Sequence, residues 1–202
     1  MRPIRRLRRA QLPADTVALA RYLIGKTLVE TGPNGRVAGR IVETEAYLVG
    51  DAACHAFRGV TPRNRSLFLA RGHAYVYFIY GVSFMLNVSS ETAGVGAGVL
   101  LRAVEPLEGA DVMAARRGLV GATPSRDLAR GPGRLARAFA IDRRYDGIDL
   151  CADGPLWLGG AARARGALGA SVRIGLSVEA DRVLRFYERA NPCVSGPKWL
   201  NP

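Results

Sequence analysis

The stretch GRIVETEAY, residues 39–47, decides the fold expected of this chain. Its β-branched and aromatic residues predict a strand, and successive side chains of a strand point to opposite faces. Glu43, Glu45 and Tyr47 then share one face, whereas the opposite face carries Val42, Thr44 and Ala46. Carboxylates and an aromatic ring on one face predict that a functional site lies there.

A second stretch, YVYFIYG at residues 75–81, repeats the arrangement. Tyr75 and Tyr77 share a face of the predicted strand, and Tyr80 precedes a glycine that can end it. The 22 residues from 50 to 71 are rich in turn-forming residues and include His55. A loop of this length inside a compact domain is more often functional than idle. Carboxylate, aromatic, histidine and arginine side chains are the groups that an enzyme acting on a nucleobase needs.

The pattern outside these two stretches predicts a mixed α+β domain. Asp15 can cap a helix that Gly25 ends, and residues 26–30 and 36–47 form a hairpin. We predict further strands at residues 84–89, 99–104, 156–158, 172–176 and 183–187. Helices are predicted at 105–117 and after the Gly-Pro-Gly turn at 131–133. We expect a single domain at residues 13–202, with a curved, mostly antiparallel sheet flanked by helices. Residues 1–12 are expected to be a basic, flexible tail.

The charge of the chain indicates a polyanionic partner. Its 29 basic residues outnumber 17 acidic ones, which gives a net charge of +12. Such an excess favours nucleic acid, because arginine binds phosphate in a bidentate manner. The alternative is an arginine-rich proteome that uses arginine wherever a cation is tolerated.

The cysteine and hydropathy patterns indicate the compartment. The three cysteines share no CxxC spacing, so neither a disulfide framework nor a cysteine-rich zinc site is expected. Two histidines, 18 residues apart, also give no metal-site spacing. No apolar run is long enough to span a membrane. We expect a cytoplasmic, unsecreted protein without membrane contact, associated with the nucleoid if the source is bacterial.

Ordered motifs along almost the whole chain resemble the alkyladenine (3-methyladenine) DNA glycosylase family. They are GRIVETEAY at 39–47, TPRNR at 61–65, YVY at 75–77, IYG at 79–81, NVSS at 87–90, LLRAVEP at 100–106, ARGPGRL at 129–135 and LRFY at 184–187. The resemblance implies a monofunctional base-excision repair enzyme, without cofactor or metal, that acts on damaged purines in double-stranded DNA. We expect 3-methyladenine and 7-methylguanine as substrates, then hypoxanthine and ethenoadenine. A monomer is the default expectation.

The resemblance also implies a role for each matching residue. Glu45 corresponds to the general base that activates water, and Arg102 and the backbone carbonyl of Ile174 would hold that water. The flipped base would contact Tyr47, Ala53, His55, Tyr77 and Asn87, with the Asn87 amide opposing the exocyclic amine of guanine. Tyr80 would fill the space that the base vacates. Thr61, Arg63 and Arg65 would bind DNA phosphates.

Other functions stay open at this level. Taken alone, Glu45 can be a solvent-facing or arginine-paired strand residue, and the tyrosines can simply pack. A non-catalytic protein that binds damaged DNA would use the same basic, aromatic surface. A metal-dependent nuclease would use Glu43, Glu45, Asp51 and His55. The binding protein would release no base, and the nuclease would lose its activity in EDTA.

Overall fold

The computed structural model describes residues 3–33, 35–79, 81–120, 124–197, 199 and 201. Over these ranges the α-helices are α1 (Thr16–Leu23), α2 (Ala110–Arg116) and α3 (Pro132–Ala138). The strands are β1 (Thr27–Gly32), β2 (Gly35–Tyr47), β3 (Ala74–Ile79), β4 (Ser83–Ser89), β5 (Gly98–Glu108), β6 (Leu156–Gly159), β7 (Leu168–Ser171) and β8 (Arg185–Glu188). Short 3-10 helices lie at Arg9–Gln11, Arg65–Phe68, Ser125–Asp127 and Arg143–Tyr145.

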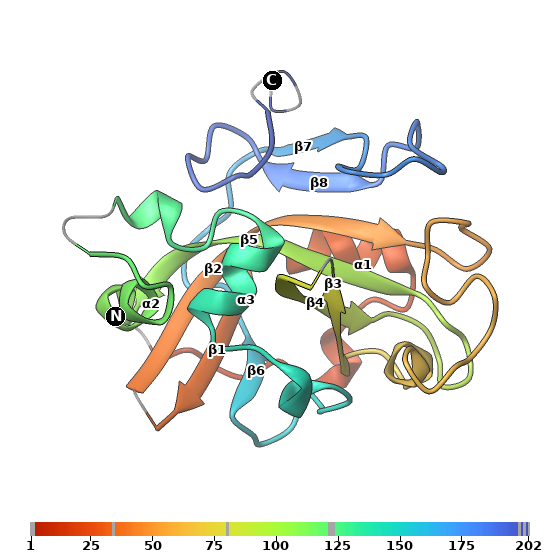
Figure 1. Cartoon of the computed structure of the whole chain (residues 1–202), viewed down its shortest axis with the longest axis horizontal. Helices are drawn as coiled ribbons and strands as arrows, with labels where there is room; N and C mark the ends of the chain where they lie inside the picture. Colours follow the sequence, from red (N-terminus) through yellow and green to blue (C-terminus); the bar gives the residue numbers. More distant parts are fainter. Residues whose placement is uncertain are drawn as a thin grey trace.

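All strand pairs described are antiparallel, and they form one curved sheet with the order β3-β4-β5-β2-β1-β6. β2 is the central strand, and it runs beside β5 from residue 38 to residue 47. β1 pairs with the first half of β2, whereas β8 pairs with residues 43–45 and carries β7 at its outer edge. Figure 1 shows β2 and β5 crossing the middle of the molecule, with the β7–β8 ribbon above them. The predicted fold class, one α+β domain with a curved antiparallel sheet, is confirmed.

Three register shifts interrupt the pairing of β2 with β5, one between Ala38 and Gly39 and two around Glu43. Ile41 pairs with Val104 and Glu43 with Ala103, so Val42 is an extra residue on β2. Thr44 then pairs with Leu101, which makes Arg102 an extra residue on β5. A bulge locally breaks the alternation of side chains between the two faces. Val42 therefore packs with Ala103, Tyr187, Cys193 and Val194 instead of joining the main core, contrary to the strict alternation predicted.

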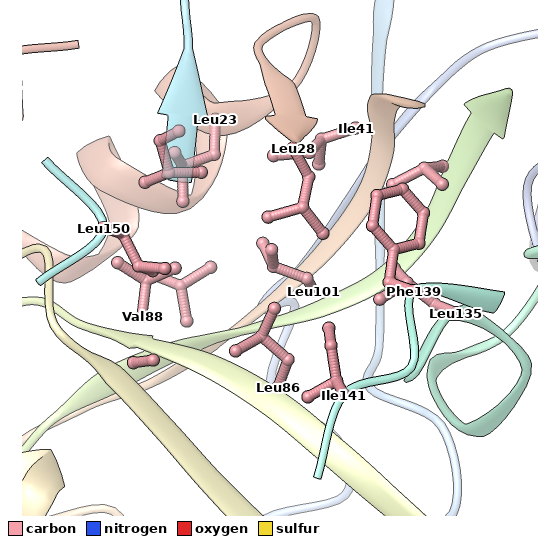
Figure 2. Packing of buried hydrophobic residues seen from close by; sticks show 14 of the residues in the cluster. Leu23, Leu28, Ile41, Leu86, Val88, Leu101, Leu135, Phe139, Ile141 and Leu150 are labelled. Carbon is pink, nitrogen blue, oxygen red and sulfur yellow. The ribbon is translucent and has the colours of Figure 1, made fainter. Parts of the chain in front are cut away.

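The main core lies between the sheet and the helices (Figure 2). α1 begins at Asp15, whose side chain accepts a hydrogen bond of 2.7 Å from the Ala18 amide, as predicted. α1 packs on the back of β2, where the Thr44 hydroxyl donates to the Ala20 carbonyl at 3.0 Å. Thr44 and Ala46 thus face α1 and the core. Glu43, Glu45 and Tyr47 are left on the other face.

The helix predicted at 105–117 exists only from residue 110, and the strand predicted at 172–176 was wrong. Residues 105–108 continue β5 instead of starting a helix, and α2 begins only after Gly109, whose φ of +73° suits glycine. Residues 172–176 form a loop, and the nearest strand is β7, which ends at Ser171. The apolar residues of this loop face the site described below. The prediction failed because Val172 and Ile174 are β-branched residues of the kind that strands favour.

Two further observations concern the N-terminal segment and membrane contact. Within residues 3–12, expected to form a flexible tail, Leu7 and Leu12 are buried, and the Leu7 amide donates to the Leu158 carbonyl on β6 at 2.8 Å. None of the helices described is both long and apolar enough for a membrane span.

Candidate active site

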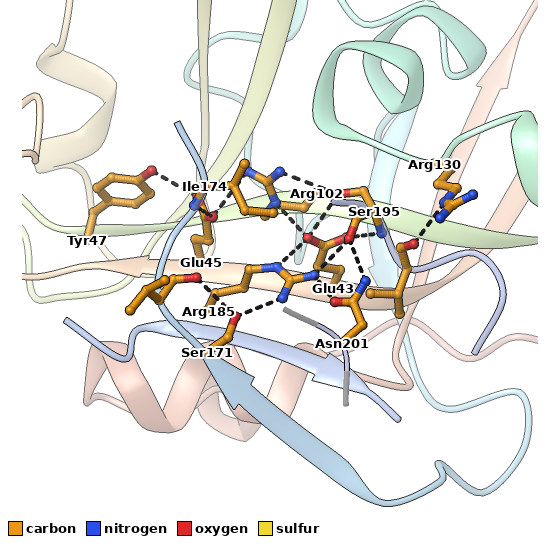
Figure 3. Close-up of polar contacts among 12 residues, drawn as sticks. Glu43, Glu45, Tyr47, Arg102, Arg130, Ser171, Ile174, Arg185, Ser195 and Asn201 are labelled. Carbon is orange, nitrogen blue, oxygen red and sulfur yellow. Dashed lines mark hydrogen bonds and ion pairs between the residues drawn. The ribbon is translucent and has the colours of Figure 1, made fainter. Parts of the chain in front are cut away.

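The carboxylate of Glu45 is fully buried and is held by three donors, one on the same strand and two from distant parts of the chain (Figure 3). The Tyr47 hydroxyl donates to Oε2 at 3.0 Å, and the Ile174 amide donates to Oε1 at 2.8 Å. Nη1 of Arg102 lies 3.1 Å from Oε1. Glu45 and Tyr47 were expected on one face of a strand. The loop at 172–176 completes the set from the far end of the chain.

Arg102 bridges Glu45 and Glu43. Its Nε donates to Glu43 Oε1 at 2.7 Å while Nη1 contacts Glu45. The β5 bulge brings the guanidinium between the two carboxylates, which lie two residues apart on β2 and therefore on the same face of the strand. Burial alone would lower the pKa of Arg102, but Glu45 and Glu43 outweigh it and raise the pKa. Arg102 is therefore a permanent cation beside Glu45.

Glu43 is the centre of a buried ionic cluster. Besides Arg102, its carboxylate accepts from Arg185 Nε at 2.7 Å and from the Ser195 amide and hydroxyl at 2.6 and 2.9 Å. Burial raises the pKa of Glu43, but Arg102 and Arg185 outweigh this effect and lower it. Arg185 also donates to Ser171 at 2.8 Å and Asn201 at 2.7 Å (Figure 3). Glu43 thereby fastens the C-terminal segment to the site.

The three donors that hold Glu45 also line a pocket of about 400 Å³. Its wall is formed by Tyr47, Ala53, His55, Tyr77 and Asn87, the residues predicted for base binding. The structure therefore brings together all five, next to Arg102 and Ile174. A pocket of this size and aromatic lining accommodates a ligand as large as a purine.

One wall of the pocket is a cluster of aromatic rings. The ring centroids of His55 and Tyr77 are 4.4 Å apart, and those of Tyr75 and Tyr77 are 5.4 Å apart with their planes inclined by 30°. His55 Nδ1 lies 2.8 Å from the Tyr75 hydroxyl. Burial, and then the charge of Arg63, lower the pKa of His55. The imidazole is therefore neutral at physiological pH, and this wall carries no positive charge.

Tyr47, on strand β2, keeps its proton. Burial and the neighbouring Glu45 carboxylate raise the pKa of Tyr47 above its ordinary value. The hydroxyl is thus a permanent donor to Glu45. Asn87, on β4, is buried and its Nδ2 donates to the Tyr75 carbonyl at 3.3 Å.

Asn64 organises the loop between β2 and β3. Its Nδ2 donates to the carbonyl of His55 at 2.7 Å and to that of Gly59 at 3.0 Å. Its Oδ1 accepts from the Thr61 amide at 2.6 Å and the Thr61 hydroxyl at 3.0 Å. In this structure the Thr61 side chain supports the loop. Arg63 and Arg65 are exposed, as phosphate-binding groups must be. Tyr80, predicted to replace the flipped base, lies outside the described residues.

A basic groove of about 620 Å³ adjoins the pocket, and Met85 and Pro132 line both. We define it by four arginines: Arg117 and Arg130 lie between α2 and α3, and Arg134 and Arg137 lie on α3. Burial, and then the charges of Arg134 and Arg137, lower the pKa of Arg117. Asp127 offsets part of this repulsion, and no carboxylate is among the described residues that line the groove, so the groove is positively charged.

Several residues of the site were not selected from the sequence. Tyr75 could have been selected, since it shares a strand face with Tyr77. Ser195 and Arg185 gave no such signal, because their role depends on contacts with Glu43 at sequence separations of 152 and 142. The contact of the Ile174 amide with Glu45 was also not predicted; the role expected of the Ile174 carbonyl, to hold the water, stays a prediction.

The carboxylates considered for a metal-dependent nuclease have arginine partners. Glu43 is paired with Arg102 and Arg185, and Asp51 is paired with the buried Arg173. Across the part of the chain that the structure describes, no group of three or more His, Cys, Asp or Glu side chains could hold a metal ion.

Known proteins resemble this chain over most of its length. The methylpurine-DNA glycosylase family matches residues 10–192. Relatives named "Putative 3-methyladenine DNA glycosylase" occur in Mesorhizobium japonicum (62% identical, covering 95% of this chain and 91% of the relative) and in Paraburkholderia phytofirmans (55%, covering 98% and 92%). One so named in Methanocella arvoryzae is 46% identical and covers 91% and 95%. Because the family matches almost the whole chain and these relatives are 46–62% identical to it, the chain belongs to the methylpurine-DNA glycosylase family.

Proposed function

We propose that this DNA glycosylase removes alkylated and deaminated purines from double-stranded DNA by hydrolysis with a water that Glu45 activates. The substrates would be 3-methyladenine and 7-methylguanine, together with hypoxanthine and ethenoadenine. The observation that carries the proposal is the buried Glu45 carboxylate, fixed by three residues that line an aromatic pocket. The reaction leaves an intact abasic site.

The geometry around Glu45 suits a general base. A carboxylate can accept about four hydrogen bonds, and three donors among the described residues contact this one. Capacity for a water molecule therefore remains. The ionised group would take a proton from that water and stabilise positive charge on the sugar as the base leaves. Arg102 helps to keep the carboxylate charged and oriented.

The aromatic pocket accounts for recognition of the damaged base. A glycosylase must flip its target nucleotide out of the duplex, because the stacked base is inaccessible. Tyr47 on one side and the rings of His55 and Tyr77 on the other would enclose the base. Stacking on an aromatic ring is worth about 1–3 kcal/mol per base, and a cationic alkylated purine also gains cation–π attraction. The Asn87 amide would oppose the exocyclic amine of an undamaged guanine.

The basic groove and the loop arginines account for DNA binding. The groove continues from the pocket, so its arginines can contact the backbone of the strand whose base is flipped. Arg63 and Arg65 provide further exposed cations on the loop between β2 and β3. Tyr80 is proposed to occupy the space that the flipped base leaves. Contacts of this kind release counterions, so binding should weaken steeply with salt.

The lysine content favours hydrolysis over strand cleavage. A lyase forms a Schiff base between a lysine and the sugar. Of the two lysines in the chain, Lys26 packs against the Tyr22 ring at 4.3 Å and does not line the pocket, whereas Lys198 lies outside the described residues. Water is therefore the nucleophile in this proposal.

The test is base release by the purified protein in the presence of EDTA. An end-labelled duplex with one hypoxanthine, and separately methylated DNA, are incubated and then heated with or without alkali. Free base should appear, and strands should break only after alkali. Glu45→Gln keeps the size of the side chain and its bonds from Ile174 and Arg102, but it cannot take a proton. The single-turnover rate should fall about 10²–10⁴-fold.

The matched control is Glu108→Gln, which changes a half-exposed carboxylate on the same sheet. It should leave the rate unchanged. Binding of the duplex without release of any base would instead establish a damaged-DNA-binding protein, and activity that EDTA abolishes would contradict the metal-independent mechanism.

A further inference from the structure

A second buried ion pair, Asp51 with Arg173, lies behind the pocket. Both side chains are fully buried, and the guanidinium contacts the carboxylate through both terminal nitrogens, Nη2 at 3.2 Å from Oδ1. The catalytic scheme above does not use this pair. Burying two charges costs free energy unless close contacts offset that cost. A buried ion pair in this place therefore suggests that the pair has a function.

Arg173 contacts the elements that hold Glu45. Its guanidinium carbon lies 4.7 Å from the centroid of the Tyr47 ring, which lines the pocket while Arg173 does not. Nη1 donates to the Ala46 carbonyl, the residue between Glu45 and Tyr47, at 3.1 Å. The next residue along the chain is Ile174, whose amide donates to Glu45. Two of the three Glu45 donors are therefore attached directly to Arg173.

Asp51 extends these contacts to the other side of the pocket. Its Oδ1 accepts from the Ala53 amide at 3.0 Å, and its carbonyl accepts from the Cys54 amide at 2.9 Å. These bonds shape the turn that leads into His55. Burial raises the pKa of Asp51, but hydrogen bonds from Arg173 and Ala53 outweigh it and lower the pKa. The turn is thus fastened to a permanent ion pair.

We infer that Arg173 is a positioning residue that fixes the position of the Glu45 carboxylate relative to the base-binding walls of the pocket. The inference rests on the proposed function of the site. The face of the planar guanidinium of Arg173 contacts the Tyr47 ring, and its terminal nitrogens contact Asp51. The backbone of Arg173 positions Ile174, and the ion pair of Arg173 with Asp51 positions the Ala53–His55 turn.

This role requires arginine. Lysine has the same charge but lacks the planar fork that stacks on a ring and contacts a carboxylate with two nitrogens. Arg173→Lys should therefore preserve a charge pair with Asp51 but lose both the stacking on the Tyr47 ring and the contact through two nitrogens. Because a displacement of about 1 Å in a catalytic site can cost about 10²-fold in rate, we expect Arg173→Lys to slow base release by about that factor.

The experiment measures the single-turnover rate of hypoxanthine release per active site, counted by titration with the damaged duplex. The variants are Arg173→Lys and the double variant Arg173→Met with Asp51→Leu. Replacing a buried ion pair with apolar residues often preserves stability, so the double variant should fold. Both should release base slowly. Arg40→Met is the control, because it breaks another buried arginine pair, with Glu105 and Glu188, away from the pocket. It should lower stability and leave the rate per active site unchanged.

Amide hydrogen exchange of the free protein provides a readout that does not depend on catalysis. Arg173→Lys should reduce protection at the Ile174 and Ala53 amides, and Arg40→Met should not. A full rate per active site in both Arg173 variants, or unchanged protection at both amides, would overturn the inference. An equal loss of rate in Arg40→Met would also overturn it. If the wild type releases no base but the exchange result holds, the proposed function fails and the positioning role stands.

Discussion

Arginine is used in opposite ways in two adjoining regions of this molecule. In the Glu43 cluster, Arg102 and Arg185 are buried and their charge is compensated by carboxylates at hydrogen-bond distance. In the basic groove, Arg134 and Arg137 are exposed, and their positive charges lower the pKa of the neighbouring Arg117. A compensated, buried arginine fixes geometry, whereas an uncompensated, exposed one attracts an anion. The first region should therefore govern stability and rate, and the second DNA affinity.

The largest effect should come from removing the charge at the centre of the cluster. Glu43→Gln leaves Arg102 and Arg185 short of a buried counter-charge, so we expect the free energy of unfolding to fall by about 3–5 kcal/mol. Denaturant titration measures it. Glu108→Gln on the surface should change it by less than about 0.5 kcal/mol. Equal effects of the two substitutions would mean that the cluster does not stabilise the fold.

Acid should remove the same stabilisation. The pKa of Glu43 in the folded protein lies below that of the unfolded chain, so the unfolded chain binds a proton first as the pH falls. The stability that Glu43 contributes is present above the ordinary glutamate pKa of about 4.3 and is lost as the pH falls through the folded value. The difference in unfolding free energy between wild type and Glu43→Gln should therefore narrow in acid. A difference that stays constant down to acid unfolding would refute this account.

Substitutions in the basic groove should act on binding. Arg134→Ala and Arg137→Ala should each weaken DNA binding and reduce the slope of log affinity against log salt by about 1. The single-turnover rate at saturating protein should not change. Arg163→Ala is the control, since the charge of this half-exposed arginine is paired with Glu105. A lower rate at saturation in the groove variants would show that the two regions are not separable.

The smallest effect should be a shift in the titration of His55. Burial and Arg63 both lower the pKa of His55, so Arg63→Ala should raise it partway toward the ordinary value. The NMR titration of the imidazole measures this shift. Arg65→Ala, which removes a neighbouring loop charge, should leave the titration in place. A midpoint that does not respond to Arg63→Ala would mean that the loop charge is screened from the pocket.

Most of the fold followed from local patterns. The Asp15 cap, the β1–β2 hairpin and the strands around the Gly81 turn lie where propensity and turn residues predicted them, because contacts close in sequence decide such elements. The failures at residues 105–108 and 172–176 have another cause. There, pairing with β2 in the first case and packing on Glu45 in the second decide the conformation, and both partners are far along the chain.

The sequence by itself determined the composition of the site: Glu45 and Tyr47 on one strand face, the tyrosines of β3, the arginine excess and the family. Only the tertiary structure decided how these groups meet. The Arg102 bulge places one guanidinium against two carboxylates, and the Ile174 amide reaches Glu45 across 129 residues. Alternation along a strand is a local rule that a sequence displays, whereas a bulge and a long-range hydrogen bond depend on the packing of the whole domain.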